Sequence, residues 1–513
     1  MYSTAKAAVA LLILVALSAC SLSPDPVPLQ TVRDSADADI QSVYSNQEAL
    51  NGRLGLYEAM ARALKYNLDN RVALMQEALA QGQAELVRYD MLPTLAVSAG
   101  YLRRNNFNAS SSISVITGQE SLEPSFSQER ERTVADFRFS WNLLDFGVSY
   151  LQAKQEADRY LIAKRQRQEI MLNLLQQTRA AFWRAAAAQA VQDDVAAALS
   201  TARDALDDVD AVIEERLQPP LDTLQIKREL LGVINELETL LQDLSIVQLQ
   251  LAGLINQPPT RDIELAYPQS LPNLPKLDQD LDALELMALA NSGDYGEQLY
   301  NIRIAQRQSR ISLLRLLPGL ELGYAGNFDS NDLLFNNVWR QASVQVTANL
   351  MQLLTYPQRK EVNEAQLLLA DAQRQATAVA ILTQTNIAWR RYQDATVRLD
   401  RAQQLEEVEA AIADLTSRVE STDAASVVER VQSDAESLRA NLEKLQAYAD
   451  AQEAMGAVHA TLGLNPVPAD YNALPVKDLA DELRRRMKTW EAGDLPTAAF
   501  ETAEEAGDNA LSG

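Results

Sequence analysis

The stretch RTVADFRFSWNLLDFGVSYLQAKQEADRYLIAKRQR, residues 132–167, decides the fold of this chain. Its first third alternates strictly between apolar and polar residues, and the apolar positions are Phe137, Phe139, Trp141 and Leu143. A period of two predicts a β-strand with one apolar and one polar face. After Gly147 the pattern changes to charged residues and alanines without a helix breaker, which predicts a long α-helix.

The length and polarity of this strand favour the wall of a membrane β-barrel. A tilted barrel strand needs roughly 9–11 residues, with apolar side chains toward lipid and polar side chains toward the lumen. The core of a soluble β-sandwich is the alternative interpretation of the aromatic residues. Asp136 and Arg138 on the opposite face favour the barrel wall, as does the tendency of Trp and Tyr to gather at membrane surfaces.

The composition indicates a mainly α-helical protein. Among 513 residues only 18 are Gly and 18 are Pro, while Ala, Leu, Gln and Glu are abundant, as is typical of long helices. The formal net charge of −24 argues against binding to nucleic acid, whose phosphates would be repelled. A duct lined by this negative charge would favour cations.

The N-terminus carries a processing signal. Lys6 precedes an apolar run at 7–17 that is too short to span a membrane, and the run ends in Leu-Ser-Ala-Cys. This ending resembles the bacterial lipobox and predicts a signal peptide at 1–19 with lipid attachment at Cys20. An ordinary secretory signal with a chance cysteine is the alternative. Cys20 is the only cysteine, so we expect no disulfide framework, and no later apolar run is long enough to predict a transmembrane helix.

A first repeat, at 54–257, runs helix, strand, strand, long helix, return helix. Its strands are predicted at about 94–103 and 133–143, and the polar segment between them lacks periodicity. Pro93 ends the first helix, and Pro219-Pro220 turns the chain after a helix of about seventy residues.

A second repeat, at 281–466, has the same order. Its strands are predicted at about 319–326 and 339–350. Asn349-Leu350-Met351 corresponds to Asn142-Leu143-Leu144, and Pro357 takes the place of Gly147. A period of just over 200 residues exceeds that of solenoid repeats and indicates an internal duplication.

The long helices carry apolar residues at steps of three and four, the pattern of a coiled-coil seam. In the first repeat these are Val195, Leu199, Ala202, Leu206, Val209 and Ile213, then Leu230, Ile234, Leu237, Leu241 and Leu244. We expect the two faces to pack as an antiparallel hairpin. The second repeat shows the spacing in Leu405, Val408, Ile412 and Leu415, then in Val428, Val431, Ala435, Leu438, Leu442 and Leu445.

Three segments lie outside the repeats. Residues 20–53 form a polar tether with three prolines, predicted to be extended, and 258–280 form a linker. Residues 467–513 form a C-terminal extension, with a short helix predicted at 476–490 and an acidic tail behind it.

The duplicated order, the strand ending in Trp-Asn-Leu-Leu-Asp-Phe-Gly and the lipobox cysteine together resemble the outer membrane factor (TolC-type) family. The resemblance covers roughly residues 54–466. It implies a homotrimer whose twelve strands form one outer-membrane barrel, continued by an α-helical coiled-coil tunnel across the periplasm. It also implies work with a periplasmic adaptor and an inner-membrane pump.

Physical reasoning reaches part of this without the family. Four strands cannot close a barrel, and an open sheet edge facing lipid would leave backbone N–H and C=O groups without partners. The smallest membrane barrels use about eight strands, so the chain must associate with further copies. A dimer with eight strands also satisfies this requirement, and the trimer comes from the resemblance.

The resemblance places the two helix bends at the periplasmic end, where the duct closes and a partner docks. It implies docking arginines at Arg216 and Arg418 and entrance acids at Asp222 and Glu429. The glycine that family bends often carry is missing from both bends. Ordinary bend and surface charges are the alternative interpretation of all four residues.

Catalytic motifs are absent from the sequence. The single histidine, His459, has no cysteine or second histidine for metal or nucleophile chemistry, so we expect it to be structural. No phosphate-binding Gly-rich loop occurs, and we expect no cofactor and no enzymatic activity. The function predicted is a passive export duct in the outer membrane. The alternative is a lipid-anchored periplasmic coiled-coil scaffold or adaptor without a pore.

Overall fold

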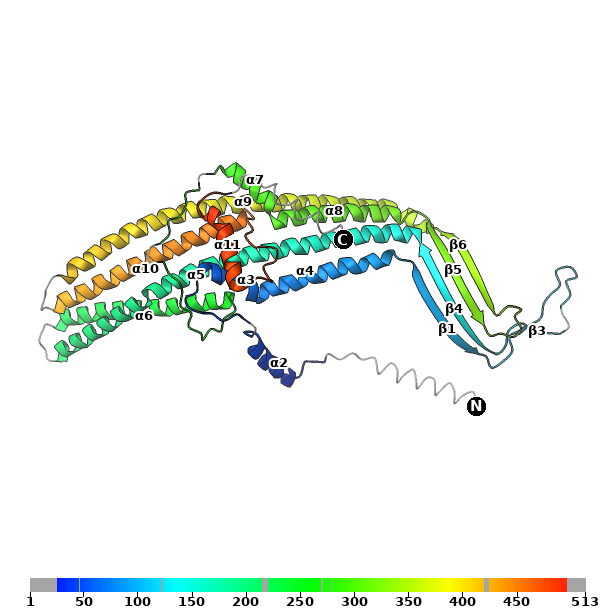
Figure 1. The fold of residues 1–513 in the computed structure, drawn as a ribbon, viewed down its shortest axis with the longest axis horizontal. Helices are drawn as coiled ribbons and strands as arrows, with labels where there is room; N and C mark the ends of the chain where they lie inside the picture. Colours follow the sequence, from blue (N-terminus) through cyan, green and yellow to red (C-terminus); the bar gives the residue numbers. More distant parts are fainter. Residues whose placement is uncertain are drawn as a thin grey trace.

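The computed structural model describes residues 25–45, 47–120, 123–214, 220–268, 271–277, 279–418 and 424–495. The molecule is elongated. A β-sheet forms one end, paired long helices form the other, and short helices lie across the middle (Figure 1). None of the helices within these ranges combines the length and the apolar content that crossing a bilayer requires.

The main sheet has four antiparallel strands in the order β1-β4-β5-β6. These strands are β1 (Thr94–Arg103), β4 (Glu131–Asn142), β5 (Gly319–Asp329) and β6 (Val338–Thr347). Each lies within a few residues of its predicted position. The loop between β1 and β4 was expected to be irregular throughout, but it contains a short ribbon of β2 (Ala109–Ser110) and β3 (Ser125–Phe126).

Two long helices start directly from the ends of two strands. They are α5 (Leu143–Glu214), which follows β4, and α9 (Leu350–Ser417), which follows β6 closely. The Asn142 side chain accepts a hydrogen bond from the Leu144 N–H at 3.0 Å, and Asn349 accepts one from the Met351 N–H at 3.1 Å. These N-caps satisfy N–H groups that a helix start otherwise leaves without partners.

The helix starts correct two sequence expectations. Each long helix begins at the leucine after its capping asparagine, so Leu143 belongs to α5 and not to the strand. Pro357 does not mark a boundary, because α9 continues through it. A proline removes one backbone hydrogen bond, and a helix of 68 residues retains the others around it.

Each helix expected before the first strand of a repeat is in fact two helices. The pairs are α3 (Leu56–Tyr66) with α4 (Leu68–Leu86), and α7 (Leu281–Asn291) with α8 (Gly293–Leu314). A short 3-10 helix, η1 (Val87–Met91), follows α4. The breaks lie at Asn67 and Ser292, which both have ψ of 129° and both cap the second helix with their side chains. Capping lets the chain turn there without losing backbone hydrogen bonds.

The helices form one curved layer that continues the sheet. Next to the sheet the order across the layer is α4, α5, α8, α9, which matches the strands β1, β4, β5, β6 to which they connect (Figure 1). Farther away, α6 (Pro220–Leu254) and α10 (Ala424–Thr461) replace α4 and α8. The layer therefore has two edges, one formed by α4 and α6 and the other by α9.

The first helical seam is as expected, and the second is not. Val195, Leu199, Leu230 and other predicted residues of α5 and α6 form one buried cluster. In the second pair, Leu405, Val408, Ile412 and Leu415 of α9 are 43–63% exposed. The face of α9 that is buried instead includes Tyr392, Ala395, Leu399 and Ala402. The reason is that α10 packs on α5 as well as on α9, so α9 turns a different stripe toward it.

The middle of the molecule is crossed by segments from outside the repeats. The tether was expected to be extended, but it contains a helix, α2 (Leu29–Ser42). The C-terminal extension forms α11 (Val476–Glu491), whose apolar face packs on α3 and α5 through Leu479, Leu483 and Met487.

A buried carboxylate ties the two repeats together. Asp158 of α5 has a side chain only 3% exposed and forms ion pairs with Arg303 and Arg307 of α8. Arg303 Nε donates to Asp158 Oδ2 at 3.1 Å.

We expect Asp158→Asn to lower the free energy of unfolding by about 3 kcal/mol, because it leaves the two arginines without their buried counter-charge. Thermal and denaturant unfolding of the purified protein, followed by helical circular dichroism, measures this loss. The control is Glu238→Gln, which breaks the exposed pair with Arg203 between α5 and α6 and should cost less than about 1 kcal/mol. Equal losses in the two variants would contradict the role given to Asp158.

Candidate functional site: a two-faced wall with open edges

The strand register builds one continuous apolar face across the sheet. Side chains directly opposite one another on paired strands lie on the same face. One row across the four strands is Leu95, Phe139, Tyr324 and Ala342, and the row beside it contains Trp141, Leu322 and Val344. The predicted residues Phe137, Phe139 and Trp141 therefore share one face, while Leu143 lies in α5. Contact of this face with lipid stays a prediction.

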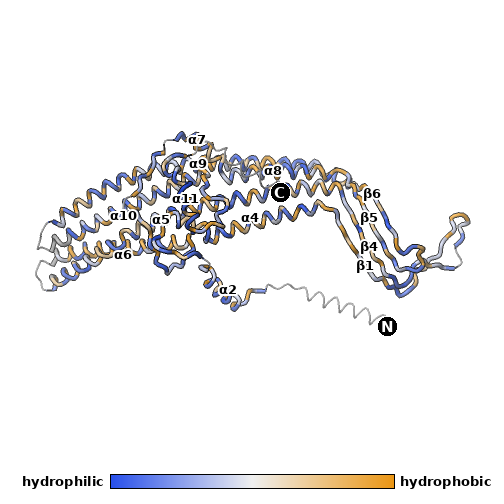
Figure 2. Tube along the Cα trace, in the orientation of Figure 1, coloured by the Kyte–Doolittle hydropathy of each residue, from blue (hydrophilic) through white to orange (hydrophobic). Residues whose placement is uncertain are grey.

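The other face of the sheet is polar. Asp136 is paired with Ser98 and Asn327, and the Ser98 hydroxyl donates to the Asp136 carboxylate at 2.5 Å. Glu321 and Gln345 are paired on the same face. The alternation of polar and apolar residues along the strands is visible in Figure 2.

Trp339 departs from the expected aromatic stripe. It is paired with Asn327, so it lies on the polar face and not with Phe137 and Trp141. Its neighbour Arg340 takes the apolar face instead, opposite Gly326. Both residues lie at the start of β6, far from the helices, where a barrel meets the outer membrane surface.

The wall has two open edges. Within the described strands, β1 and β6 each pair on one side only, which leaves a row of backbone N–H and C=O groups without strand partners. The helices that continue these edges carry exposed apolar residues at steps of three and four. On α4 these are Leu68, Val72, Met75 and Leu79; on α6, Leu221 and Leu224; on α9, the exposed seam described above.

The predicted bend residues are only partly described. Cys20 and Arg216 lie outside the described residues. Asp222 falls in the first turn of α6, and Glu429 is exposed on α10. Arg418 follows the last turn of α9, and its guanidinium pairs with Asp414 at 2.6 Å. Roles of these residues in docking or gating stay predictions.

A second cluster of charge lies between α5 and α8. Burial and a hydrogen bond with Asp294 raise the pKa of Glu169 to about 7, and the negative charges of Asp294 and Glu297 add to the effect. At neutral pH a large share of Glu169 is therefore protonated, which allows this carboxyl to lie beside Asp294 where the repeats meet.

A buried network that sequence reasoning missed holds the middle of the wall. Arg179 of α5 has a side chain 2% exposed; it forms an ion pair with Glu491 of α11 and donates to Gln452 of α10 at 2.8 Å. Tyr57 of α3 donates to the same Glu491 carboxylate. The only signal in the sequence is a lone arginine within an apolar run of α5.

His459 lies beside this network on α10. It is buried against Trp490 at a ring-centroid distance of 6.2 Å. Burial, reinforced by the positive charge of Arg179, lowers the pKa of His459 to about 3. The imidazole is therefore neutral at physiological pH and packs as a core side chain. Across the described ranges, no group of three or more His, Cys, Asp or Glu side chains is placed to hold a metal ion.

Comparison with known proteins identifies the class of fold. No protein-family model matches the chain, and no curated protein matches its sequence. Solved structures match it over most of its length, and the fold they share is that of the TolC-type outer-membrane channels.

Three of these structures show the extent of the likeness. The Campylobacter jejuni CmeC outer membrane channel matches with a TM-score of 0.63 at 14% identity, covering 86% of this chain and 94% of CmeC. The Vibrio cholerae outer membrane protein VceC matches with 0.59 at 16% identity, covering 80% and 96%. The open Neisseria gonorrhoeae MtrE outer membrane channel matches with 0.57 at 16% identity, covering 81% and 95%. At these identities the likeness establishes the fold.

Because Arg179 is buried, removing its counter-charge should be costly. We expect Glu491→Gln to lower the free energy of unfolding by about 3 kcal/mol, since the glutamine keeps the shape but not the charge. The matched control is Glu453→Gln, whose partner Arg184 also joins α5 to α10 but is 42% exposed, and which should cost less than about 1 kcal/mol. Chemical denaturation in one detergent compares the two variants, and a loss confined to the control would contradict the assignment.

The lowered pKa of His459 predicts a pH dependence of stability. The unfolded chain binds a proton at this residue below about pH 6.5, whereas the folded chain does so only near pH 3, so stability is lost as the pH falls through this window. Between pH 7 and 5 the native protein should lose about 2 kcal/mol more than His459→Gln. No other histidine contributes. Parallel unfolding curves for the two proteins would contradict the prediction.

Proposed function

We propose that this chain forms a passive outer-membrane export duct. Three copies would close into one twelve-stranded barrel continued by an α-helical tunnel. Substrates would enter from an inner-membrane pump and a periplasmic adaptor, and leave through the barrel. The observation that carries the proposal is the two-faced wall with both edges open. Comparable walls occur in CmeC and MtrE, which are channels and not enzymes.

The sheet edges support closure by further copies. An apolar outer face suits lipid, but hydrocarbon offers no hydrogen bonds to the free backbone groups of β1 and β6. Pairing β6 of one copy with β1 of the next satisfies both rows at once. Three copies of a four-stranded sheet then remove every edge.

The helical edges support the same arrangement. The exposed stripe of α9 runs along one edge of the layer, and the exposed stripes of α4 and α6 run along the other. Apolar residues at steps of three and four require a partner helix to be buried. Closing the sheet brings α9 of one copy beside α4 and α6 of the next, so the stripes cover each other.

The tips of the helices are the proposed gate. Asp222 and Glu429 would ring the entrance, with Arg216 and Arg418 at the docking surface for the adaptor. A partner that binds the open state more tightly than the closed state would open the entrance. Selectivity would come from lumen charge and bore and not from a binding pocket. Lipid at Cys20 would anchor each copy to the outer membrane.

Conductance tests the duct directly. In planar bilayers the detergent-extracted protein should conduct ions with a preference for cations. Asp222→Asn combined with Glu429→Gln should reduce this preference, because fixed acids at an entrance concentrate cations. Asp478→Asn, an exposed acid on α11 in the middle of the molecule, is the control and should change nothing. No conductance from either the native protein or the double variant would argue against a duct.

The competing function is a lipid-anchored periplasmic scaffold or adaptor without a pore. Its long paired helices would serve equally well as a rod. Extraction behaviour separates the two functions. After Cys20→Ser, a barrel should stay in the outer membrane until detergent is added, whereas a scaffold held by its lipid alone should be released in the soluble fraction.

A further inference from the structure

The helix α2 carries an apolar stripe that no described part of the chain covers. Leu29, Val32 and Ile40 lie on one side of it and are 66%, 49% and 72% exposed. Ala36 and Val43 extend the same stripe at steps of three and four. The rest of the helix is polar and mostly acidic, with Asp34, Asp37 and Asp39 against one basic residue, Arg33. Figure 1 shows α2 standing away from the body, on the side of α4 and α6.

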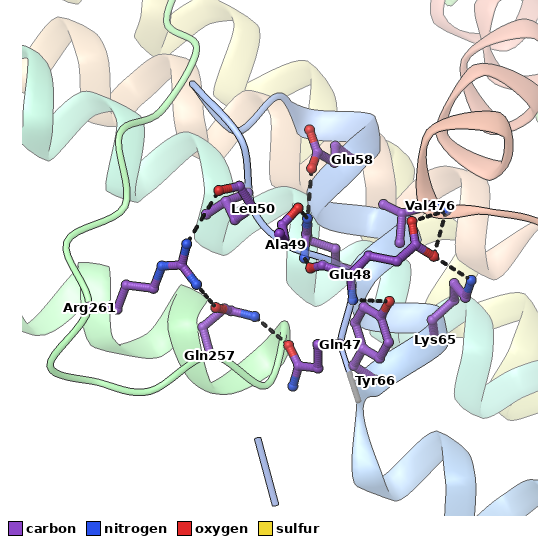
Figure 3. A network of polar contacts seen from close by, with 11 residues as sticks. Gln47, Glu48, Ala49, Leu50, Glu58, Lys65, Tyr66, Gln257, Arg261 and Val476 are labelled. Atoms are coloured by element: carbon purple, nitrogen blue, oxygen red, sulfur yellow. Dashed lines mark hydrogen bonds and ion pairs between the residues drawn. The ribbon is translucent and has the colours of Figure 1, made fainter. Parts of the chain in front are cut away.

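A polar network fixes the base of α2 at that edge. The Val43 carbonyl accepts a hydrogen bond from the Asn256 side chain, just after α6, at 2.9 Å. The next residues continue the attachment (Figure 3): the Glu48 carboxylate accepts from Lys65 at 2.9 Å and from the Val476 N–H at 3.1 Å. Arg62, 1% exposed, donates to the Glu48 and Ala49 carbonyls at 2.9 and 3.0 Å. The segment from Val43 to Ala49 therefore cannot slide along the wall.

The opposite edge of the layer carries an apolar cavity at the middle of the molecule. Its volume is about 590 Å³, and it opens between α9 and the linker at 273–277. Trp389, Tyr392 and Leu399 of α9 line one side, and Leu274 and Leu277 of the linker line the other. The Tyr392 hydroxyl donates to the Pro275 carbonyl at 2.5 Å, which holds the two walls together.

We propose that α2 of one copy docks into this cavity on the next copy of the same chain. The inference rests on the homotrimer proposed above. Closing the layer places the α4 and α6 edge of one copy beside the α9 edge of the next. A helix that projects beyond the first edge then lies over the second edge at the level of the cavity, and its stripe covers the apolar lining.

Docking of α2 into the cavity of its own chain is excluded by length. The cavity and the base of α2 lie at opposite edges of a layer four helices wide. Neighbouring helix axes are about 8–10 Å apart, so the two edges are separated by about 24–30 Å. A helix of 14 residues is about 21 Å long and is held at its C-terminal end by Asn256.

The chemistry of the two surfaces is complementary. Aromatic side chains in a concave apolar lining are typical of places that accept a partner's aliphatic residues. Lys276 at the rim is a basic partner for the aspartates of α2. The strap would link neighbouring copies far from both the barrel and the gate.

Crosslinking between differently tagged copies tests the inference. One copy carries Ile40→Cys in the stripe and the other carries Thr396→Cys in the cavity lining, and the two are coexpressed as full chains. A short bismaleimide should give a product with both tags at about tenfold the yield of the control pair, because docking raises the effective concentration of the two thiols. The control replaces Ile40→Cys with Ala38→Cys, on the opposite face of α2. Each single variant shows any reaction through Cys20.

The outcomes separate this inference from the duct itself. A trimer by size, with no more crosslinking for Ile40→Cys than for Ala38→Cys, overturns the docking of α2 and leaves the duct standing. A monomer by size overturns the trimer. Protection of Ile40→Cys from a water-soluble maleimide in lipid vesicles but not in detergent would assign the stripe to a membrane surface and also overturn the inference.

Discussion

The structure depends on one constraint, the hydrogen bonding of backbone groups along the edges of a four-stranded sheet. In water an unpaired strand edge is tolerated, because solvent supplies the missing partners. In hydrocarbon each unpaired group costs several kcal/mol, so an apolar sheet face and a free edge cannot both meet lipid. The apolar face of β1, β4, β5 and β6 is continuous. Further copies are the simplest way to satisfy both edges.

The same constraint explains why the strands run straight into helices. Each strand must leave the sheet without an irregular segment whose backbone would lack partners. Asn142 and Asn349 solve this by ending a strand and capping a helix within a few residues. Helix order then copies strand order, so whatever pairs the sheet edges also brings the edge helices together. The exposed stripes of α4 and α9 follow from this geometry.

Periodicity in the sequence was sufficient for the strands and for the first helical seam, because both are local patterns. It failed where a residue's partner lies far along the chain. The stripe at Leu405 was assigned to the wrong partner because the position of α10 between α5 and α9 cannot be derived from spacing. The caps at Asn67 and Ser292 were missed because helix periodicity continues across them. Arg179 was missed because its counter-charge is 312 residues away.

The distribution of buried charge bears on where the wall can move. Asp158, Arg179 and Arg62 are all buried and paired, and all lie in the half of the wall nearer the sheet or in the middle belt. Toward the tips the ion pairs are exposed, as for Arg203 with Glu238, and the seam of α5 and α6 is aliphatic. Buried pairs have one geometry and resist displacement, whereas an aliphatic seam can shift at little cost. A wall built this way is stiff at the belt and compliant at its free end, which is where a gate driven by a docking partner must act.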